Sequence, residues 1–219
     1  FMKGVFAVTA AVVVLCVAVI CLFVFARSVP AIGEIGFLEF LFSTDWRPGD
    51  TPPAYGIGTM IVGTCYVTAG ALVIGVPLGL LMAAFMARYC PNSLYKVMKP
   101  MVNILAGIPS IVYGYFGMTV IAPMIRDNLG GTGYSILTAS VVLGIMILPT
   151  VVSVSESALR ALPATYYEGA RALGATHERA VFLTEFPAAK SGILTSVVLG
   201  LGRVVGETCL LYTSDAADD

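Results

Sequence analysis

The residues best suited to chemistry are an arginine and a glutamate inside an apolar run. Arg203 and Glu207 interrupt residues 188–211, and Arg203 comes 13 residues after Lys190. A helical rise of about 1.5 Å per residue places Arg203 roughly 20 Å beyond Lys190. A charge at that depth in a bilayer costs about 2.5–3.5 kcal/mol, so we expect it to face a cavity or a partner. Its guanidinium could bind an oxyanion such as phosphate through two parallel hydrogen bonds.

Glu207 lies four residues after Arg203, on the same face of a helix, where the two side chains can pair. Glycines 202 and 206 share this spacing and would let another helix approach closely. Two interpretations stay open. Either Arg203 meets an anion while Glu207 competes for it and keeps binding transient, or the two form a structural ion pair within the bundle or at a subunit interface.

A second candidate for anion contact is the break at Gly107-Ile-Pro-Ser110, about midway through another apolar run. A helix interrupted near the bilayer midplane can aim backbone N–H groups at an anion. Ser110 and Tyr113 could add hydroxyl donors. The alternative is a kink that serves packing only.

Composition places these residues in a membrane protein. Of 219 residues, 58% are hydrophobic and 11% are charged, whereas a soluble domain carries about 25% charged residues. The net charge of −1 and the lack of a basic block give no indication of nucleic-acid binding. No G-x-x-x-x-G-K-[ST] phosphate loop is present, so ATP hydrolysis would come from a partner, and we expect no cofactor or metal.

The elements that must position the candidate residues are apolar helices, each needing about 20 residues to cross a bilayer core. The predicted fold class is all-α, a polytopic transmembrane helix bundle. The predicted spans cover about residues 4–26, 59–87, 100–125, 134–155 and 188–211.

The charged loops between these runs predict the orientation. Arg88, Lys96 and Lys99 share a short loop without an acid, which places that loop in the cytoplasm. Alternation then puts the N-terminus and residues 156–187 on the cytoplasmic side and the loop 27–58 outside. Because residues 156–187 are rich in charge, we expect this segment to lie in water, and we expect a short interfacial piece at 37–42.

Residues 163–187 predict two short helices around a turn. Pro163 suits the first turn of a helix, and Gly174 can take the left-handed conformation that ends it. Thr176 can cap the next helix, and Pro187 would end that helix before the last span. A helical elbow that projects into water is suited to docking another protein.

This elbow resembles the EAA loop of ABC importer permeases, which in that family docks on the ATP-hydrolysing subunit. The positions that match are Glu168, Ala170, Gly174 and Pro187. The segment departs from the family at Gly169, where alanine is usual, and at Thr184 and Phe186, where aliphatic residues are usual. The resemblance implies that residues 168–170, 174 and 187 form the contact with the ATPase.

Three further stretches, Phe40–Trp46, Ala106–Gly114 and Gly200–Thr208, narrow the resemblance to phosphate-importer permeases of the PstC type. This resemblance implies a type I ABC importer permease fold in a prokaryotic cytoplasmic (inner) membrane. It implies a transport subunit rather than an enzyme. The implied partners are a second permease subunit, a dimer of ATP-binding subunits and a soluble phosphate-binding protein.

Three alternatives remain open. The nearest is a permease for another oxyanion, such as sulfate, molybdate or phosphonate. The second is a membrane-embedded enzyme, although no group of His, Asp and Glu converges near the membrane face. The third is a scaffold without transport, which would not need Arg203 inside the bilayer.

We expect residues 1–208 to form one transmembrane domain. Residues 209–219 resemble the translation of a sequencing-library adapter, so we expect this tail to be foreign and a sixth span to be truncated; the alternative is a native polar tail.

Overall fold

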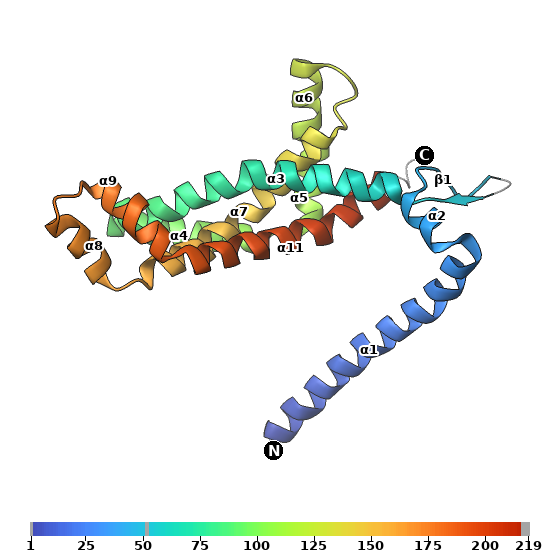
Figure 1. The fold of residues 1–219 in the computed structure, drawn as a ribbon, viewed down its shortest axis with the longest axis horizontal. Helices are drawn as coiled ribbons and strands as arrows, with labels where there is room; N and C mark the ends of the chain where they lie inside the picture. Colours follow the sequence, from blue (N-terminus) through green and yellow to red (C-terminus); the bar gives the residue numbers. More distant parts are fainter. Residues whose placement is uncertain (1, 51–52, 216–219) are drawn as a thin grey trace. The chain divides into compact units, whose positions relative to one another are not determined.

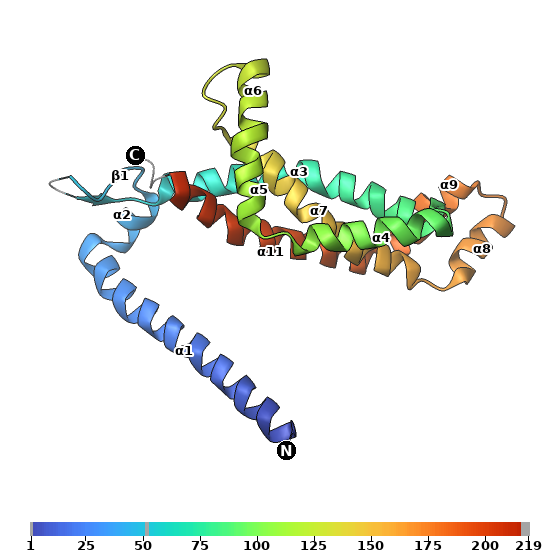
Figure 2. The ribbon, with the colours of Figure 1, turned by 180° about the vertical axis from the view of Figure 1, so that it is seen from behind.

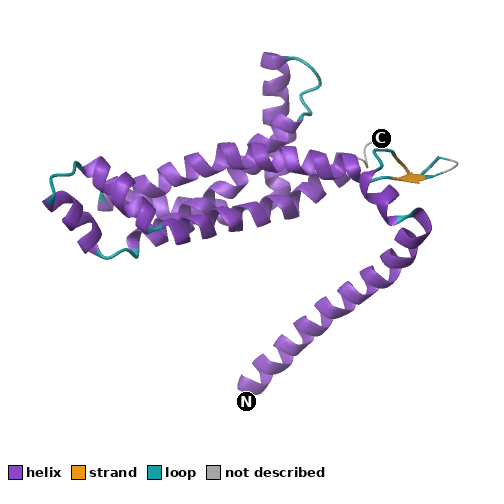
Figure 3. Ribbon diagram, in the orientation of Figure 1, coloured by secondary structure: helices purple, strands orange, loops and turns teal. Residues whose placement is uncertain are grey.

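The computed structural model describes residues 2–50 and 53–215, with side chains described as far as Glu207. The chain divides into two compact units, Phe1–Val62 and Gly63–Asp219. Helices dominate both units, and the first unit adds one short hairpin (Figure 3). The predicted all-α fold class is confirmed.

The first unit begins with helix α1 (Met2–Ile35), which runs past the predicted span end at residue 26 and buries none of its side chains. Gly36, with a φ of 95°, ends α1 and starts α2 (Phe37–Phe42), where a short piece was expected. Strands β1 (Trp46–Arg47) and β2 (Ala54–Tyr55) then form an antiparallel hairpin that composition did not indicate.

The second unit is built around three long helices that run side by side (Figures 1 and 2). They are α3 (Gly58–Ala84), whose first turn belongs to the first unit, α7 (Ile136–Arg160) and α11 (Lys190–Asp215). A short π-helix, η1 (Phe85–Tyr89), extends α3. The side chains of Ala71, Ile147 and Val204 are fully buried between these helices.

Small residues let α3 and α7 approach closely. A Cβ atom on Gly75 would lie 2.7 Å from the carbonyl oxygen of Gly144 and 2.7 Å from a side-chain carbon of Ile147. Contacts of 2.7 Å are shorter than van der Waals separation, so only glycine fits at position 75. Between α7 and α11, the buried hydroxyls of Ser155 and Ser196 lie 2.7 Å apart.

The predicted break in the third apolar run is a sharp bend. Helix α4 (Asn92–Gly107) is followed by α5 (Ser110–Phe116), η2 (Gly117–Ile121) and α6 (Ala122–Leu129), and the two arms meet at 92°. Ile108 and Pro109 have extended backbones, with ψ angles of 127° and 140°. Proline disfavours the helical conformation at the residue before it, which explains the site of the break. As a result α6 points away from α3, α7 and α11 (Figure 1).

Four short elements lead from α7 to α11 at one end of the second unit (Figure 1). They are α8 (Ala164–Ala172), α9 (His177–Arg179), η3 (Ala180–Glu185) and α10 (Phe186–Ala188). Gly174 has a φ of 84°, so the predicted left-handed turn is confirmed. The predicted stop at Pro187 is wrong by two residues, because the chain stays helical to Ala188 and turns at Ala189, where it bends by 72°.

By length and composition, three described helices can cross a membrane, and each of the two bent pairs could supply one further span. The grouping of residues 1–208 into one domain stays a prediction. The proposed foreign tail over residues 209–219 falls outside the residues whose side chains are described.

Candidate functional site

Most residues matched to the EAA loop lie on α8 and the turn after it, whereas Pro187 lies on α10. Glu168 and Gly169 are exposed, and Ala170 is half-buried. Leu173, next to the turn at Gly174, keeps 92% of its surface exposed. The structure therefore presents this helix outward, as a docking surface requires.

The charged start of α9 lies beside this surface. The Thr176 hydroxyl oxygen accepts a hydrogen bond from the Arg179 N–H at 3.4 Å, which confirms Thr176 as the cap of α9. Hydrogen bonds from its own backbone N–H and from the Thr176 hydroxyl lower the pKa of Glu178. This exposed carboxyl therefore stays ionised at neutral pH, next to the partial positive charge of a helix N-terminus.

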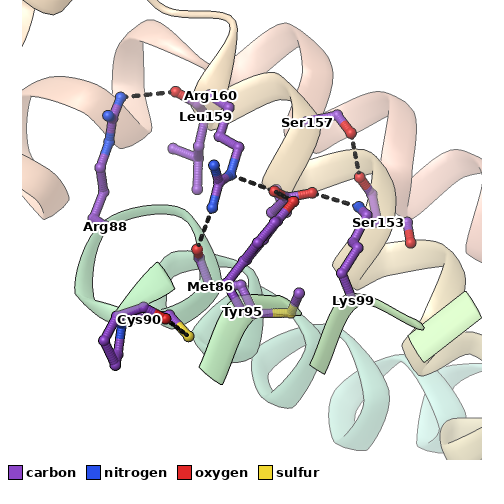
Figure 4. Close-up of polar contacts among 11 residues, drawn as sticks. Met86, Arg88, Cys90, Tyr95, Lys99, Ser153, Ser157, Leu159 and Arg160 are labelled. Carbon is purple, nitrogen blue, oxygen red and sulfur yellow. Dashed lines mark hydrogen bonds and ion pairs between the residues drawn. The ribbon is translucent and has the colours of Figure 1, made fainter. Parts of the chain in front are cut away.

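Behind the exposed surface, the elbow is joined to η1 by an ion pair. An Arg88 nitrogen, Nη2, lies 2.6 Å from Oε1 of Glu185, whose side chain is fully buried. The same nitrogen donates a hydrogen bond to the carbonyl oxygen of Leu159 at 2.9 Å, as Figure 4 shows for Arg88 and Leu159. Arg88 thus contacts both the end of α7 and the end of η3.

A second buried carboxylate, Glu156 on α7, is the centre of a larger cluster. Lys99 Nζ lies 2.6 Å from Oε2, the Tyr95 hydroxyl donates to Oε1 at 2.9 Å, and Arg160 forms an ion pair with Oε1. Arg160 also donates to the Met86 carbonyl oxygen at 2.8 Å and stacks over the Tyr95 ring at 4.0 Å. Figure 4 shows Lys99, Tyr95 and Arg160 converging from α4 and α7.

These two carboxylates correct the expectation that residues 156–187 lie entirely in water. Glu156 and Glu185 expose 1% and 0% of their surface. Sequence reasoning missed the cluster, although a signal existed. Arg88 and Lys99 have no acid in their own loop, so their partners must come from a distant part of the chain.

The predicted pathway residues are brought together in part. Tyr113 is buried with Val204, the neighbour of Arg203, and its hydroxyl donates to the Leu105 carbonyl oxygen at 2.9 Å across the bend. Ser110 is the first residue of α5 and is half-buried.

Arg203 and Glu207 are both half-buried on α11. Among the side chains that the structure describes, no ion pair within 4.0 Å joins them. The predicted pairing is therefore not formed in this state, and the role of both residues in the pathway stays a prediction.

The second unit thus combines a bundle of apolar helices with a helical elbow at one end, as expected for an importer permease. Residues 75–214 match the family model described as "Binding-protein-dependent transport system inner membrane component", and the chain belongs to this family. The family match confirms the class predicted from the sequence, an ABC importer permease.

Individual relatives narrow the class. The chain is 43% identical over 171 residues to the probable ABC transporter permease protein YqgH of Bacillus subtilis, covering 78% of this chain and 55% of that protein. It is 34% identical over 216 residues to the phosphate transport system permease protein PstC 2 of Mycobacterium tuberculosis, covering 90% of this chain and 66% of that protein. The chain thus spans between about half and two thirds of the length of these relatives.

Solved structures support the same fold. The chain is similar to the MetNI methionine ABC transporter in an inward-facing conformation, with a TM-score of 0.55, 26% identity and coverage of 71% of this chain and 70% of that chain. An amino acid ABC transporter, at 20% identity and a TM-score of 0.52, supports the fold alone, over 71% of this chain and 69% of that chain.

Proposed function

We propose that this chain is a permease subunit of an ATP-driven importer of inorganic phosphate. The similarity to PstC proteins over up to 90% of this chain carries the proposal. The chain would pair with a second permease subunit to form the translocation pathway. ATP hydrolysis would take place on a dimer of separate ATP-binding subunits, and a soluble phosphate-binding protein would deliver the cargo from outside.

The proposed contact with the ATP-binding subunit is the elbow that contains Glu168, Gly169, Ala170, Gly174 and Pro187. The exposure of α8 supports this assignment, as does the attachment of the elbow to η1 by the Arg88–Glu185 ion pair. When ATP closes the ATPase dimer, the elbow would move and the bundle would switch the side on which the pathway is open. The N-terminus and the elbow would both face the cytoplasm.

The proposed pathway residues are Arg203, Glu207, Ser110 and Tyr113. A half-buried guanidinium without an ion pair among the described side chains is available to an anion. Arginine suits phosphate because its planar fork can donate two parallel hydrogen bonds to two oxygens. Tyr113, buried near this part of α11, would line the approach.

Uptake into proteoliposomes tests the proposal. The chain is reconstituted with a second permease subunit, the ATP-binding subunits and a phosphate-binding protein, and radiolabelled phosphate is supplied outside. We expect ATP-dependent uptake that unlabelled phosphate suppresses and that sulfate, molybdate or phosphonate does not. ATP-dependent uptake of one of these anions, supplied as the labelled cargo, with no uptake of phosphate would assign the importer to that other cargo.

A further inference from the structure

Two buried carboxylates join separate elements of the second unit: Glu156 joins α4 to α7, and Glu185 joins the elbow to η1. They differ in how completely they are bonded. Glu156 has three partners, two of them cationic. Glu185 has a single cation, Arg88, within ion-pair distance among the residues that the structure describes. The cluster around Glu156 and the pair at Glu185 therefore form two joints of different kinds.

The Glu156 joint ties α7 to two earlier elements, η1 and α4, that follow one another in the sequence. Lys99 and Tyr95 come from α4, Arg160 comes from α7, and Arg160 reaches the Met86 carbonyl oxygen on η1. Each oxygen of the carboxylate is engaged, which is the condition under which a buried ion pair offsets its desolvation. We expect α4, α7 and η1 to move as one piece.

The Glu185 joint is incomplete. The Arg88 nitrogen Nη2 lies 2.6 Å from Oε1, yet neither Glu185 oxygen accepts a well-directed hydrogen bond within the described chain. Arg88 Nε is also buried without an acceptor among the described residues. Buried charged groups that lack hydrogen bonds are costly, so this pair is weaker than the fully bonded Glu156 cluster.

An open arrangement is available to both partners. Arg88 keeps its hydrogen bond to the Leu159 carbonyl oxygen when Glu185 withdraws, and 23% of its side chain is already exposed. Glu185 lies at the end of η3, four residues before the 72° bend at Ala189, where the chain can hinge.

We propose that the Arg88–Glu185 pair is a releasable joint between the elbow and the bundle, whereas the Glu156 cluster is a fixed joint within the bundle. Force on α8 would open the Arg88–Glu185 joint while the unit of α4, α7 and η1 stays intact. Arg88 and Glu185 are positioning residues in this scheme, since neither touches the cargo. Their part in transport rests on the proposed function, whereas the joint itself does not.

Hydrogen–deuterium exchange on the full chain in detergent tests the joint without any cargo. Glu185→Gln and Arg88→Gln should each speed amide exchange in residues 177–189 by about tenfold, the factor expected from losing one interaction with a charged group. Exchange in residues 136–155 should not change. Arg179→Gln, which removes an exposed charge in the same segment, is the matched control and should leave both regions unchanged.

Three results would overturn the joint. One is unchanged exchange in residues 177–189 for Glu185→Gln. Another is acceleration of residues 136–155 to the same extent, which would make Glu185 part of one rigid core. The third result applies if Glu185→Gln fails to fold. Glu185→Asp then replaces it, because aspartate keeps the charge on a shorter side chain. Exchange at the wild-type rate in Glu185→Asp would count against the joint.

The role in transport is measured in the reconstituted complex as phosphate moved per ATP hydrolysed. Glu185→Gln should leave assembly intact and ATP hydrolysis within about twofold, while transport per ATP falls by about tenfold, within the range typical of coupling between sites. If an assembled Glu185→Gln complex moves the normal amount of phosphate per ATP, Glu185 has no part in coupling ATP hydrolysis to transport. A wild-type complex that moves no phosphate would refute the proposed function instead, and the exchange experiment would still decide the joint.

Discussion

The hydroxyl of Tyr167 lies 2.7 Å from Nδ1 of His177, across the turn formed by Gly174. The ring of Tyr89, from η1, meets the same imidazole edge-on at a centroid distance of 4.6 Å. A left-handed glycine, hydrogen bonds across the turn and an aromatic contact with η1 thus contribute to the shape of the elbow.

Gly174→Ala should loosen this elbow. At a φ of 84°, a Cβ atom meets the neighbouring carbonyl and costs about 1–2 kcal/mol. We expect faster limited proteolysis within residues 164–188 and unchanged cleavage elsewhere. Resistance equal to that of the wild type would show that the turn tolerates a side chain.

Gly169→Ala is the matched glycine replacement in the same segment. Gly169 lies inside α8, and a Cβ atom at this position would have nothing within 4 Å, so alanine fits without a clash. Alanine favours a helix over glycine by about 0.5–1 kcal/mol. The variant should therefore resist proteolysis slightly better than the wild type, and a loss of resistance would contradict the assignment of this position to an open helix surface.

Gly75→Val should disrupt the packing of α3 against α7. The new side chain would meet the Gly144 carbonyl and the Ile147 side chain, and overpacking of this kind costs about 1–3 kcal/mol or more. Unfolding in mixed detergent micelles measures the loss. Gly202→Ala, at an open position on α11, should leave the unfolding free energy unchanged or slightly higher.

Glu156→Ala should be more harmful than removal of any exposed carboxylate. It leaves Lys99 and Arg160 without their counter-charge, and breaking a buried pair costs about 3–5 kcal/mol. We expect the lower end, about 3 kcal/mol, because 27% of Lys99 and 42% of Arg160 remain exposed to solvent. Asp127→Ala, which removes the exposed partner of Arg126, should change the unfolding free energy by less than about 1 kcal/mol.

Arg203→Gln should abolish phosphate uptake while the complex still assembles. Arg203→Lys should keep part of the uptake, since lysine supplies the charge without the bidentate geometry. Lys190→Gln, at the exposed start of α11, serves as the control and should transport normally. Normal phosphate uptake by Arg203→Gln would show that Arg203 does not bind the anion and that its role is structural.

Local features of the fold were predictable from the sequence. Gly174 and Thr176 act within one turn of the chain, so their conformations follow from residue type and spacing. The break at Pro109 was predictable for the same reason. Its 92° angle was not, because the angle depends on what the two arms pack against.

The buried charges were not predictable from local sequence. Glu156 and Glu185 look like members of a water-exposed charged segment until their partners are known, and the Lys99 partner of Glu156 lies 57 residues away. The close approach of α7 at Gly75 was not predictable either, because a glycine in an apolar run does not show which helix packs against it.

The contact between Lys99 and Glu156 has a consequence for the bent stretch Asn92–Leu129. It holds the first turns of α4 against the last turns of α7. With 25 residues at about 1.5 Å each, α7 is long enough to traverse a hydrocarbon layer of roughly 30 Å, and in that arrangement Ile136 and Glu156 would lie on opposite faces. The polypeptide would then have to change sides between Lys99 and Ile136, so we expect the bent stretch to cross once rather than to dip in and return.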